Sequence, residues 1–211
     1  MASRNSFAQN AADVITSINP RFHVVIERSG LCTIGTTRGK SRSRESNFSS
    51  LASSILSQQL STKAAATIIG RVAELSGGTL QAAKLADITT SRLRSAGCSE
   101  AKARAIKELA RGVVDKKIPI TSLQRMSDEE IMEYLLPLFG IGQWTVEMFL
   151  MFQLGRHDIW PVGDLGVRRG WEKIHRMRTE IEPKALVKLG EKYAPYRSHL
   201  AWYCWRAVEV L

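Results

Sequence analysis

One carboxylate in this chain stands where it could assist bond cleavage. Asp164 closes the segment Asp158-Ile-Trp-Pro-Val-Gly-Asp164, directly before a stretch with helical periodicity. A carboxylate can stabilise positive charge that develops when a bond breaks, and it can orient or deprotonate an attacking water. An aspartate before a helix is also an ordinary helix cap, so Asp164 is a candidate for either role or for both.

A glycine-rich turn precedes this carboxylate. The string Leu136-Pro-Leu-Phe-Gly140-Ile-Gly142-Gln-Trp-Thr145 lies between two helical patterns, so its Gly-Ile-Gly must turn the chain within three residues. Glycine permits a positive φ and the close approach of another backbone. A helix that starts directly after such a turn offers unpaired N–H groups, which suit a phosphate oxygen. A plain interhelical turn is the alternative, because two glycines alone are a weak pattern.

The charge of the chain favours a polyanionic partner. The formal net charge is +10, and the sequence pI is about 9.9. Lysine and arginine placed near phosphates release condensed counterions, which drives binding to nucleic acids. Basic stretches occur at Arg38–Arg44, Lys102–Lys117 and Arg168–Arg178. The first is rich in glycine and serine, and it fits a mobile arm and a solvated linker equally well.

Metal chemistry and membrane insertion find little support in the residue types. The 3 cysteines and 4 histidines are scattered, without a Cys-x-x-Cys pair or a histidine cluster. We expect buried free thiols, and neither disulfides nor a zinc site. The chain has no apolar run of membrane-spanning length and no apolar stretch typical of a signal peptide at its N-terminus, so we expect a soluble intracellular protein.

The elements that must position these residues are helices throughout. We expect an N-terminal arm or helix over 1–46 that packs on the helical body, with Phe22–Glu27 as a strand or an extended arm. From Asn47 to Leu211 helical patterns follow one another with short loops, which predicts an all-α protein. Ser46 or Asn47, Ser61 or Thr62, and Ser127 are the expected helix caps, and Ser127 forms a capping box with Glu130.

The turn at 136–145 resembles the hairpin of the helix-hairpin-helix DNA glycosylases, a superfamily that includes the alkylated-base (3-methyladenine) glycosylases. The likeness runs from about Phe48 to Trp205. It implies a glycosylase domain over 47–211, built as a two-lobed helical bundle with a DNA-binding cleft between the lobes. It also implies that the hairpin grips a DNA phosphate and holds Na⁺ or K⁺. The implied phosphate ligands are Gly140, Gly142 and Thr145, and the implied cation ligands are the carbonyls of Leu136, Leu138 and Ile141.

The same resemblance assigns the catalytic role to Asp164, because the family carries its catalytic aspartate in a Pro-Val-x-Asp segment. Many alkylated-base glycosylases have two adjacent acids there, whereas this chain has Gly163 and then Asp164. Asp158 is the second choice, with loop capping as its alternative role. Relatives that also cut the backbone carry a lysine nucleophile where this chain has Trp144. Tryptophan cannot form a Schiff base, so we expect base removal only.

The segment that starts at Ile55 resembles the family's wedge loop, whose side chain fills the gap left by a flipped base. The resemblance implies that Gln59 intercalates, with Gln58 and Leu60 beside it. A structural role is the alternative, in which the two glutamines only pair with backbone groups in an interhelical turn.

Tryptophans are candidates for the base-binding pocket, because an electron-rich ring facing a cationic alkylated purine gains a cation–π contribution. Trp144 and Trp205 fall where related enzymes carry pocket tryptophans, and Trp160 is a further candidate. Met148 occupies a position where a relative has an aromatic ring. Trp205 also lies on a helix with apolar neighbours, so a core position is its alternative.

The sequence therefore predicts a monofunctional glycosylase that removes alkylated purines, such as 3-methyladenine and 7-methylguanine, from double-stranded DNA. We expect a monomer that needs no cofactor for catalysis and resides in the cytoplasm or nucleoid of a prokaryote or in a eukaryotic nucleus. Two alternatives stay open. One is a non-catalytic helix-hairpin-helix module that only binds DNA. The other is a sister glycosylase for oxidised, deaminated or mismatched bases.

Overall fold

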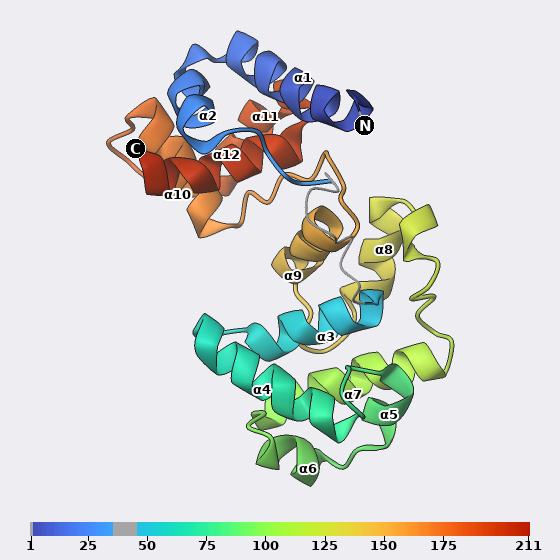
Figure 1. Cartoon of the computed structure of the whole chain (residues 1–211). Coiled ribbons are helices and arrows are strands. Elements are labelled where there is room, and N and C mark those ends of the chain that lie inside the picture. Colours follow the sequence, from blue (N-terminus) through green and yellow to red (C-terminus); the bar gives the residue numbers. More distant parts are fainter. Residues whose placement is uncertain (1, 36–45) are drawn as a thin grey trace. The chain divides into compact units, whose positions relative to one another are not determined.

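The computed structural model describes residues 2–35 and 46–211, and every regular element in these ranges is a helix (Figure 1). The prediction of an all-α chain is confirmed. The basic stretch Arg38–Arg44 lies outside the described residues. None of the helices in the two described ranges has the length and apolar character needed to cross a membrane.

The chain divides into two compact units, in agreement with the two predicted lobes. We call residues 46–149 the central unit and the described residues 2–35 and 150–211 the terminal unit. The first helices of the chain therefore share a unit with its C-terminal third.

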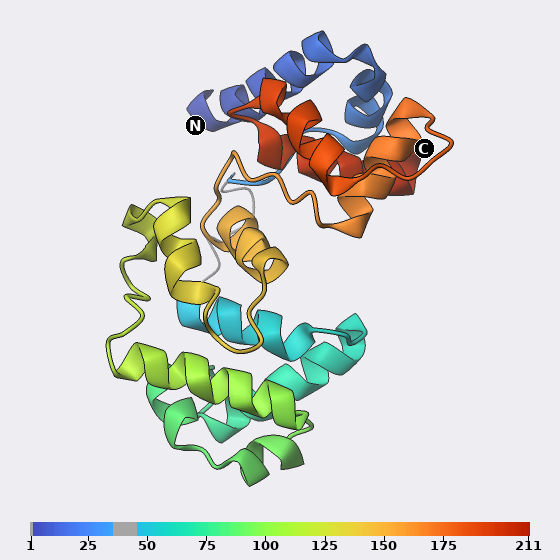
Figure 2. The same ribbon diagram turned by 180° about the vertical axis from the view of Figure 1, so that it is seen from behind.

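The central unit is organised around one long helix, α7. This helix contacts α3, α5 and α6, as Figure 2 shows from behind. The serine caps predicted at Ser46, Ser61 and Ser127 are present, and Ser127 forms its capping box with Glu130. The helices of this unit are α3 (Asn47–Ser57), α4 (Thr62–Leu75), α5 (Ala82–Asp87), α6 (Thr90–Ser95), α7 (Glu100–Val114), α8 (Asp128–Leu135) and α9 (Gln143–Met148), with a short 3₁₀ helix η2 at Leu123–Arg125.

The terminal unit is organised around α12, which contacts α10, α2 and α1 (Figure 1). Gly170 of α10 faces the backbone of Cys204 so closely that no Cβ would fit, which lets the two helices pack tightly. The helices of this unit are α1 (Ala2–Ile18), α2 (His23–Ser29), α10 (Leu165–His175), α11 (Pro183–Gly190) and α12 (Arg197–Val210), with 3₁₀ helices η1 at Pro20–Phe22 and η4 at Glu191–Tyr193.

The prediction of a strand or extended arm at Phe22–Glu27 is wrong, because this segment is helical. Asn19 caps η1 by accepting a hydrogen bond from the amide of Arg21, and a proline occupies the start of that helix. Phe22 and Val25, three residues apart, are both fully buried. β-Branched residues such as Val24, Val25 and Ile26 favour strands only weakly, and burial of one helical face outweighs that propensity here.

Candidate active site

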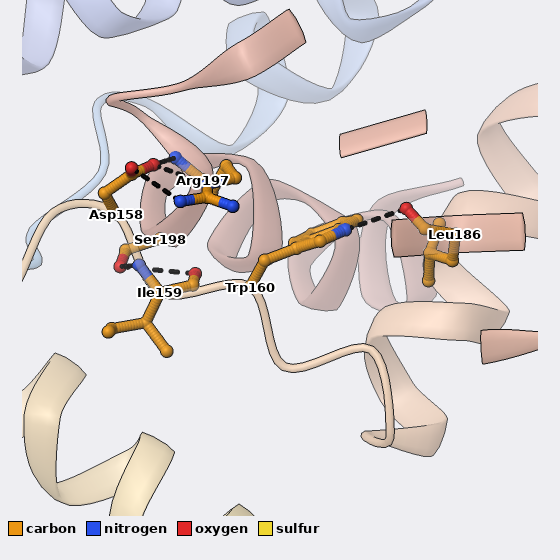
Figure 3. Close-up of polar contacts among 6 residues, drawn as sticks. All are labelled: Asp158, Ile159, Trp160, Leu186, Arg197 and Ser198. Carbon is orange, nitrogen blue, oxygen red and sulfur yellow. Dashed lines mark hydrogen bonds and ion pairs between the residues drawn. The ribbon is translucent and has the colours of Figure 1, made fainter. Parts of the chain in front are cut away.

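The loop that leads to Asp164 is anchored at three successive residues (Figure 3). Asp158 binds Arg197 through both carboxylate oxygens, with Nε to Oδ1 and Nη2 to Oδ2 each 2.7 Å apart. The amide of Ile159 donates to Oγ of buried Ser198 at 2.9 Å. The indole N–H of Trp160 donates to the carbonyl of Leu186 at 2.9 Å. The first turn of α12 and the helix α11 thus hold this loop from two sides.

Two of these contacts bear on predicted roles. Asp158, the second choice for catalysis, is one half of a bidentate ion pair, which is a structural use of a carboxylate. Trp160, predicted for the pocket, packs against α11 instead: Gly190 lies against its ring without room for a Cβ, and its N–H is bound to Leu186. A tertiary partner on α11 that the local sequence does not reveal decides the position of Trp160.

Asp164 is the N-cap of α10, and it is also bound by α12. Its Oδ1 accepts hydrogen bonds from the amide of Val167 and from the indole Nε1 of Trp205, both at 2.8 Å. The start of a helix favours a negative charge, and the indole is a second hydrogen-bond donor. Both contacts therefore suit a carboxylate. Beside this acid, burial above all and then the Asp164 charge raise the pKa of the Cys204 thiol. That cysteine is buried and free, as are Cys32 and Cys98, which confirms the prediction for all three.

Gly166 makes the contact between Asp164 and Trp205 geometrically possible. A Cβ at this position would lie 2.8 Å from Cδ1 of Trp205 and 3.1 Å from Oδ1 of Asp164. No local pattern singles out this glycine, because its φ is not positive and its partner Trp205 lies on another helix.

Phe152 forms an aromatic pair with Trp205 and was missed by the sequence analysis. The two rings are stacked, with centroids 5.8 Å apart and an interplanar angle of 28°. Phe152 is 56% exposed, although Phe149, Leu150 and Met151 just before it are buried. The regular α-helix does not continue to this residue: α9 ends at Met148, and Phe149–Gln153 forms a π-helix. A π-helix has a wider turn than an α-helix, so the burial pattern along this segment departs from the 3.6-residue periodicity.

The hairpin of the central unit uses its two glycines differently. Gly140 has φ of 80°, and a Cβ there would lie 2.8 Å from that of Ala105. Gly142 caps α9 with an extended backbone and has open space where a side chain would be. The first glycine thus meets a need of the fold itself, whereas the second leaves room for a group outside the chain.

Thr145 does not fit its predicted role as a phosphate ligand. Its side chain is 3% exposed, and its amide donates to the carbonyl of Gly142 at 3.0 Å. Nε2 of Gln58 lies 3.5 Å from its Oγ1 and donates to the carbonyl of Gly140 at 3.0 Å. Gln58 therefore ties the wedge loop to the hairpin, which is the structural role left open for it.

The remaining wedge and pocket candidates of the central unit reach the surface. Gln59 is exposed and has φ of 57°, and the neighbouring Leu60 is exposed as well. Trp144, 50% exposed, and half-buried Met148 lie four residues apart on one face of α9. The structure thus offers these four side chains to the surface of the central unit, with Asp164, Trp205 and Phe152 assembled in the terminal unit.

Within the described ranges, no three histidine, cysteine, aspartate or glutamate side chains come together in a way that could hold a metal ion. The carbonyls of Leu136, Leu138 and Ile141 belong to the hairpin, and that of Leu138 accepts the amide of Ile141 at 3.1 Å. A carbonyl oxygen has a second lone pair, so this bond leaves Leu138 able to bind a cation.

The glycine hairpin of the central unit and the helix-capping Asp164 of the terminal unit indicate the class of this protein. The family model described as HhH-GPD superfamily base excision DNA repair protein matches residues 52–195, and the chain belongs to this superfamily.

The names of similar proteins are more specific than the description of the family. The chain is 34% identical over 170 residues to DNA-3-methyladenine glycosylase 1 of Schizosaccharomyces pombe, with 79% of this chain and 75% of the relative covered. A crystal structure of a DNA-3-methyladenine glycosidase from Bacillus halodurans matches with a TM-score of 0.81 and 35% identity, covering 93% of this chain and 88% of that one. The 3-methyladenine DNA glycosylase of S. pombe in complex with abasic DNA matches with a TM-score of 0.79 and 30% identity, covering 93% and 95%.

Proposed function

We propose that this protein is a monofunctional DNA glycosylase that removes alkylated purines from double-stranded DNA by hydrolysis of the N-glycosidic bond. Membership of the base excision repair superfamily and likeness to relatives named 3-methyladenine glycosylases support the reaction and the substrate class. Trp144, at the position of the lyase lysine, supports release of the base without cutting of the backbone.

One observation carries the proposal: the carboxylate of Asp164 is held by both α10 and α12. Two hydrogen bonds to Oδ1 fix its orientation before substrate binds. A fixed negative charge stabilises an oxocarbenium-like transition state without the cost of reorganising at the moment of reaction. Because cationic alkylated purines leave readily, Asp164 needs to contribute only part of the rate.

Base selection falls to the aromatic rings connected to Asp164. Phe152 stacks on Trp205, and that indole is bound to Asp164, so the aromatic pair and the acid form one connected group. A cationic purine stacked on such rings gains a cation–π contribution that a neutral base lacks. We also propose Trp144 and Met148 of α9 as base-contacting residues, and we leave Trp160 out because its contacts are with α11.

DNA binding falls to the central unit. The amides of Gly140 and Gly142 are the proposed phosphate ligands, and open space at Gly142 supports close approach. The carbonyls of Leu136, Leu138 and Ile141 are hard oxygen donors that suit Na⁺ or K⁺, which would add positive charge beside the phosphate. Gln59 is the proposed wedge. One chain carries all of these parts, so the proposed reaction needs no second subunit.

The test compares the wild type with Asp164→Asn on duplex DNA that contains 7-methylguanine or 3-methyladenine. Released base is quantified by chromatography, and strand cutting is assayed before and after alkali. We expect the wild type to release base and to leave an alkali-labile site. Asp164→Asn is expected to be slower by roughly two orders of magnitude. Equal rates would exclude the role of Asp164, and binding without release by the wild type would point to a DNA-binding module.

A further inference from the structure

Lys102 of α7 holds the end of α3 from the side. Its Nζ donates to the carbonyls of Leu56 and Gln58, each at 2.8 Å. These carbonyls belong to the last turn of α3 and its C-cap, where a helix lacks internal partners and where a positive charge is favourable. Burial of this ammonium, the main influence on it, lowers the pKa of Lys102. The Lys102 side chain therefore stabilises the end of α3 and is not a freely solvated charge.

The segment held in this way carries the proposed wedge. Gln59 follows the anchored carbonyl of Gln58 directly, and its φ of 57° lies in the left-handed region. A side chain with a Cβ adopts that region at a cost of about 1 kcal/mol, so surrounding contacts must impose it. The side chain of Gln58 binds the hairpin carbonyl of Gly140 and supplies one such contact. Lys102 supplies the two others that fix the backbone on the N-terminal side of Gln59.

The same side of α7 also holds the hairpin. Ala105, three residues after Lys102, leaves just enough room for Gly140. Glu108, three residues further, accepts the amide of Phe139 at 3.0 Å. Residues three apart on a helix lie on one face, so this face of α7 sets the distance between the wedge loop and the hairpin.

We infer that Lys102 is a positioning residue, which holds the backbone of the wedge loop so that Gln59 stands at a fixed distance from the phosphate-binding hairpin. This inference rests on the proposed function. It also removes Lys102 from the DNA-contacting lysines suggested by the basic stretch Lys102–Lys117. Lys107 leaves that group on the same ground, because its ammonium donates to the carbonyl of Ile88. A lysine bound to two carbonyls and one bound to a phosphate differ in their dependence on salt, which makes the two roles separable by experiment.

The experiment compares Lys102→Met with a matched control, Lys107→Met. Lys107 lies on the same helix and donates to one carbonyl, that of Ile88, so its replacement removes the same charge and a similar bond away from the wedge loop. Three measurements are made: single-turnover release of 7-methylguanine at saturating protein, the salt dependence of binding to a duplex with an abasic-site analogue, and the fluorescence of 2-aminopurine next to that analogue. Thermal unfolding verifies that each variant is folded.

We expect Lys102→Met to lower the saturating rate roughly ten- to hundredfold and to reduce the fluorescence change, because a displaced wedge no longer fills the gap. The slope of log K against log[salt] should stay at the wild-type value, and Lys107→Met should leave the rate and fluorescence unchanged. A slope smaller by about 1 with an unchanged saturating rate would identify a phosphate ligand and overturn the inference. An unchanged rate and fluorescence would overturn it as well.

Lys102→Gln keeps a donor for the carbonyls without the charge, and it carries the test if Lys102→Met does not fold. If Lys102 is a positioning residue, the rate falls and the salt slope is unchanged. If Lys102 contacts a phosphate, the salt slope becomes smaller and the rate is unchanged. A wild type that binds the abasic duplex but releases no base would contradict the proposed function. The fluorescence and salt measurements require only binding, so they would still decide the role of Lys102.

Discussion

The indole N–H of Trp205 donates a hydrogen bond to Oδ1 of Asp164 at 2.8 Å, across 41 residues of sequence. Trp205 thereby has two functions: one edge fixes the proposed catalytic carboxylate, and its face stacks on Phe152. The ring that we propose selects the base and the carboxylate that we propose assists its departure are thus connected directly.

Trp205→Phe separates these two functions, because it keeps a ring for Phe152 and removes the donor for Asp164. A hydrogen bond to a charged group contributes about 1.5–3 kcal/mol, so we expect the single-turnover rate to fall roughly ten- to hundredfold. Binding to an abasic-site duplex should change little. Trp202→Phe on the same helix is the control, and an equal loss in both variants would point to a general disturbance of α12.

Gly166→Ala sets two effects of opposite sign against each other. Alanine inside a helix is favoured over glycine by about 1 kcal/mol, which on its own predicts a more stable protein. Its Cβ would lie 2.8 Å from the ring of Trp205, so we expect packing to win and both stability and the rate of base release to fall.

Gly163→Ala is the control for that substitution, since its Cβ would meet nothing within 4 Å. Urea denaturation and single-turnover assays of both variants make the comparison. A Gly166→Ala protein with raised stability and wild-type activity would show that the Trp205 ring can move aside.

Arg197→Met tests whether the anchored loop matters beyond stability. Both side chains of the Asp158–Arg197 pair are about one-third exposed, at 33% and 32%, so we expect a loss of only about 1–2 kcal/mol in urea denaturation. Arg197→Met should lower the excision rate more than Asp158→Asn does, because Arg197→Met leaves the Asp158 carboxylate without its cationic partner. Equal rates in wild type and both variants would limit the ion pair to a structural role.

His199 predicts a pH dependence of stability. It is fully buried against Phe7 and His157, and burial, with a smaller contribution from His157, lowers its pKa from 6.5 to about 4. The unfolded chain therefore binds more protons than the folded protein between pH 4 and 6.5. The contribution of neutral His199 to stability is fully present above pH 6.5 and is lost as the pH falls toward 4. The expected loss over this window is on the order of 3 kcal/mol.

The measurement is urea denaturation at pH 4.5 and pH 7, with His199→Phe as the comparison. Phenylalanine fits an aromatic cluster and has no proton to bind, so the variant should lose most of the difference between the two pH values. A variant with the same pH dependence as the wild type would assign the effect to other groups.

The parts of this protein that the sequence alone determined are those with local causes. Serines at 46, 61 and 127 cap the helices that follow them, because an N-cap hydroxyl lies within reach of the backbone amide three residues later. The Gly-Ile-Gly turn and the Pro-Val-Gly-Asp segment are likewise contiguous, so their likeness to a known family could be read directly. The replacement of the lysine by Trp144 could likewise be recognised from its position in the hairpin sequence alone.

The tertiary structure decided everything that depends on a distant partner. Trp160 turned to α11, Thr145 was buried beside Gln58, and a π-helix exposed Phe152. Gly166 and Lys102 gained their importance from Trp205 and from the end of α3, contacts that no local pattern encodes. A side chain's type limits which bonds it can make, but the packing of α7 and α12 selects which of them form. The sequence could therefore predict candidate reacting residues, and only the fold could show which residues hold them.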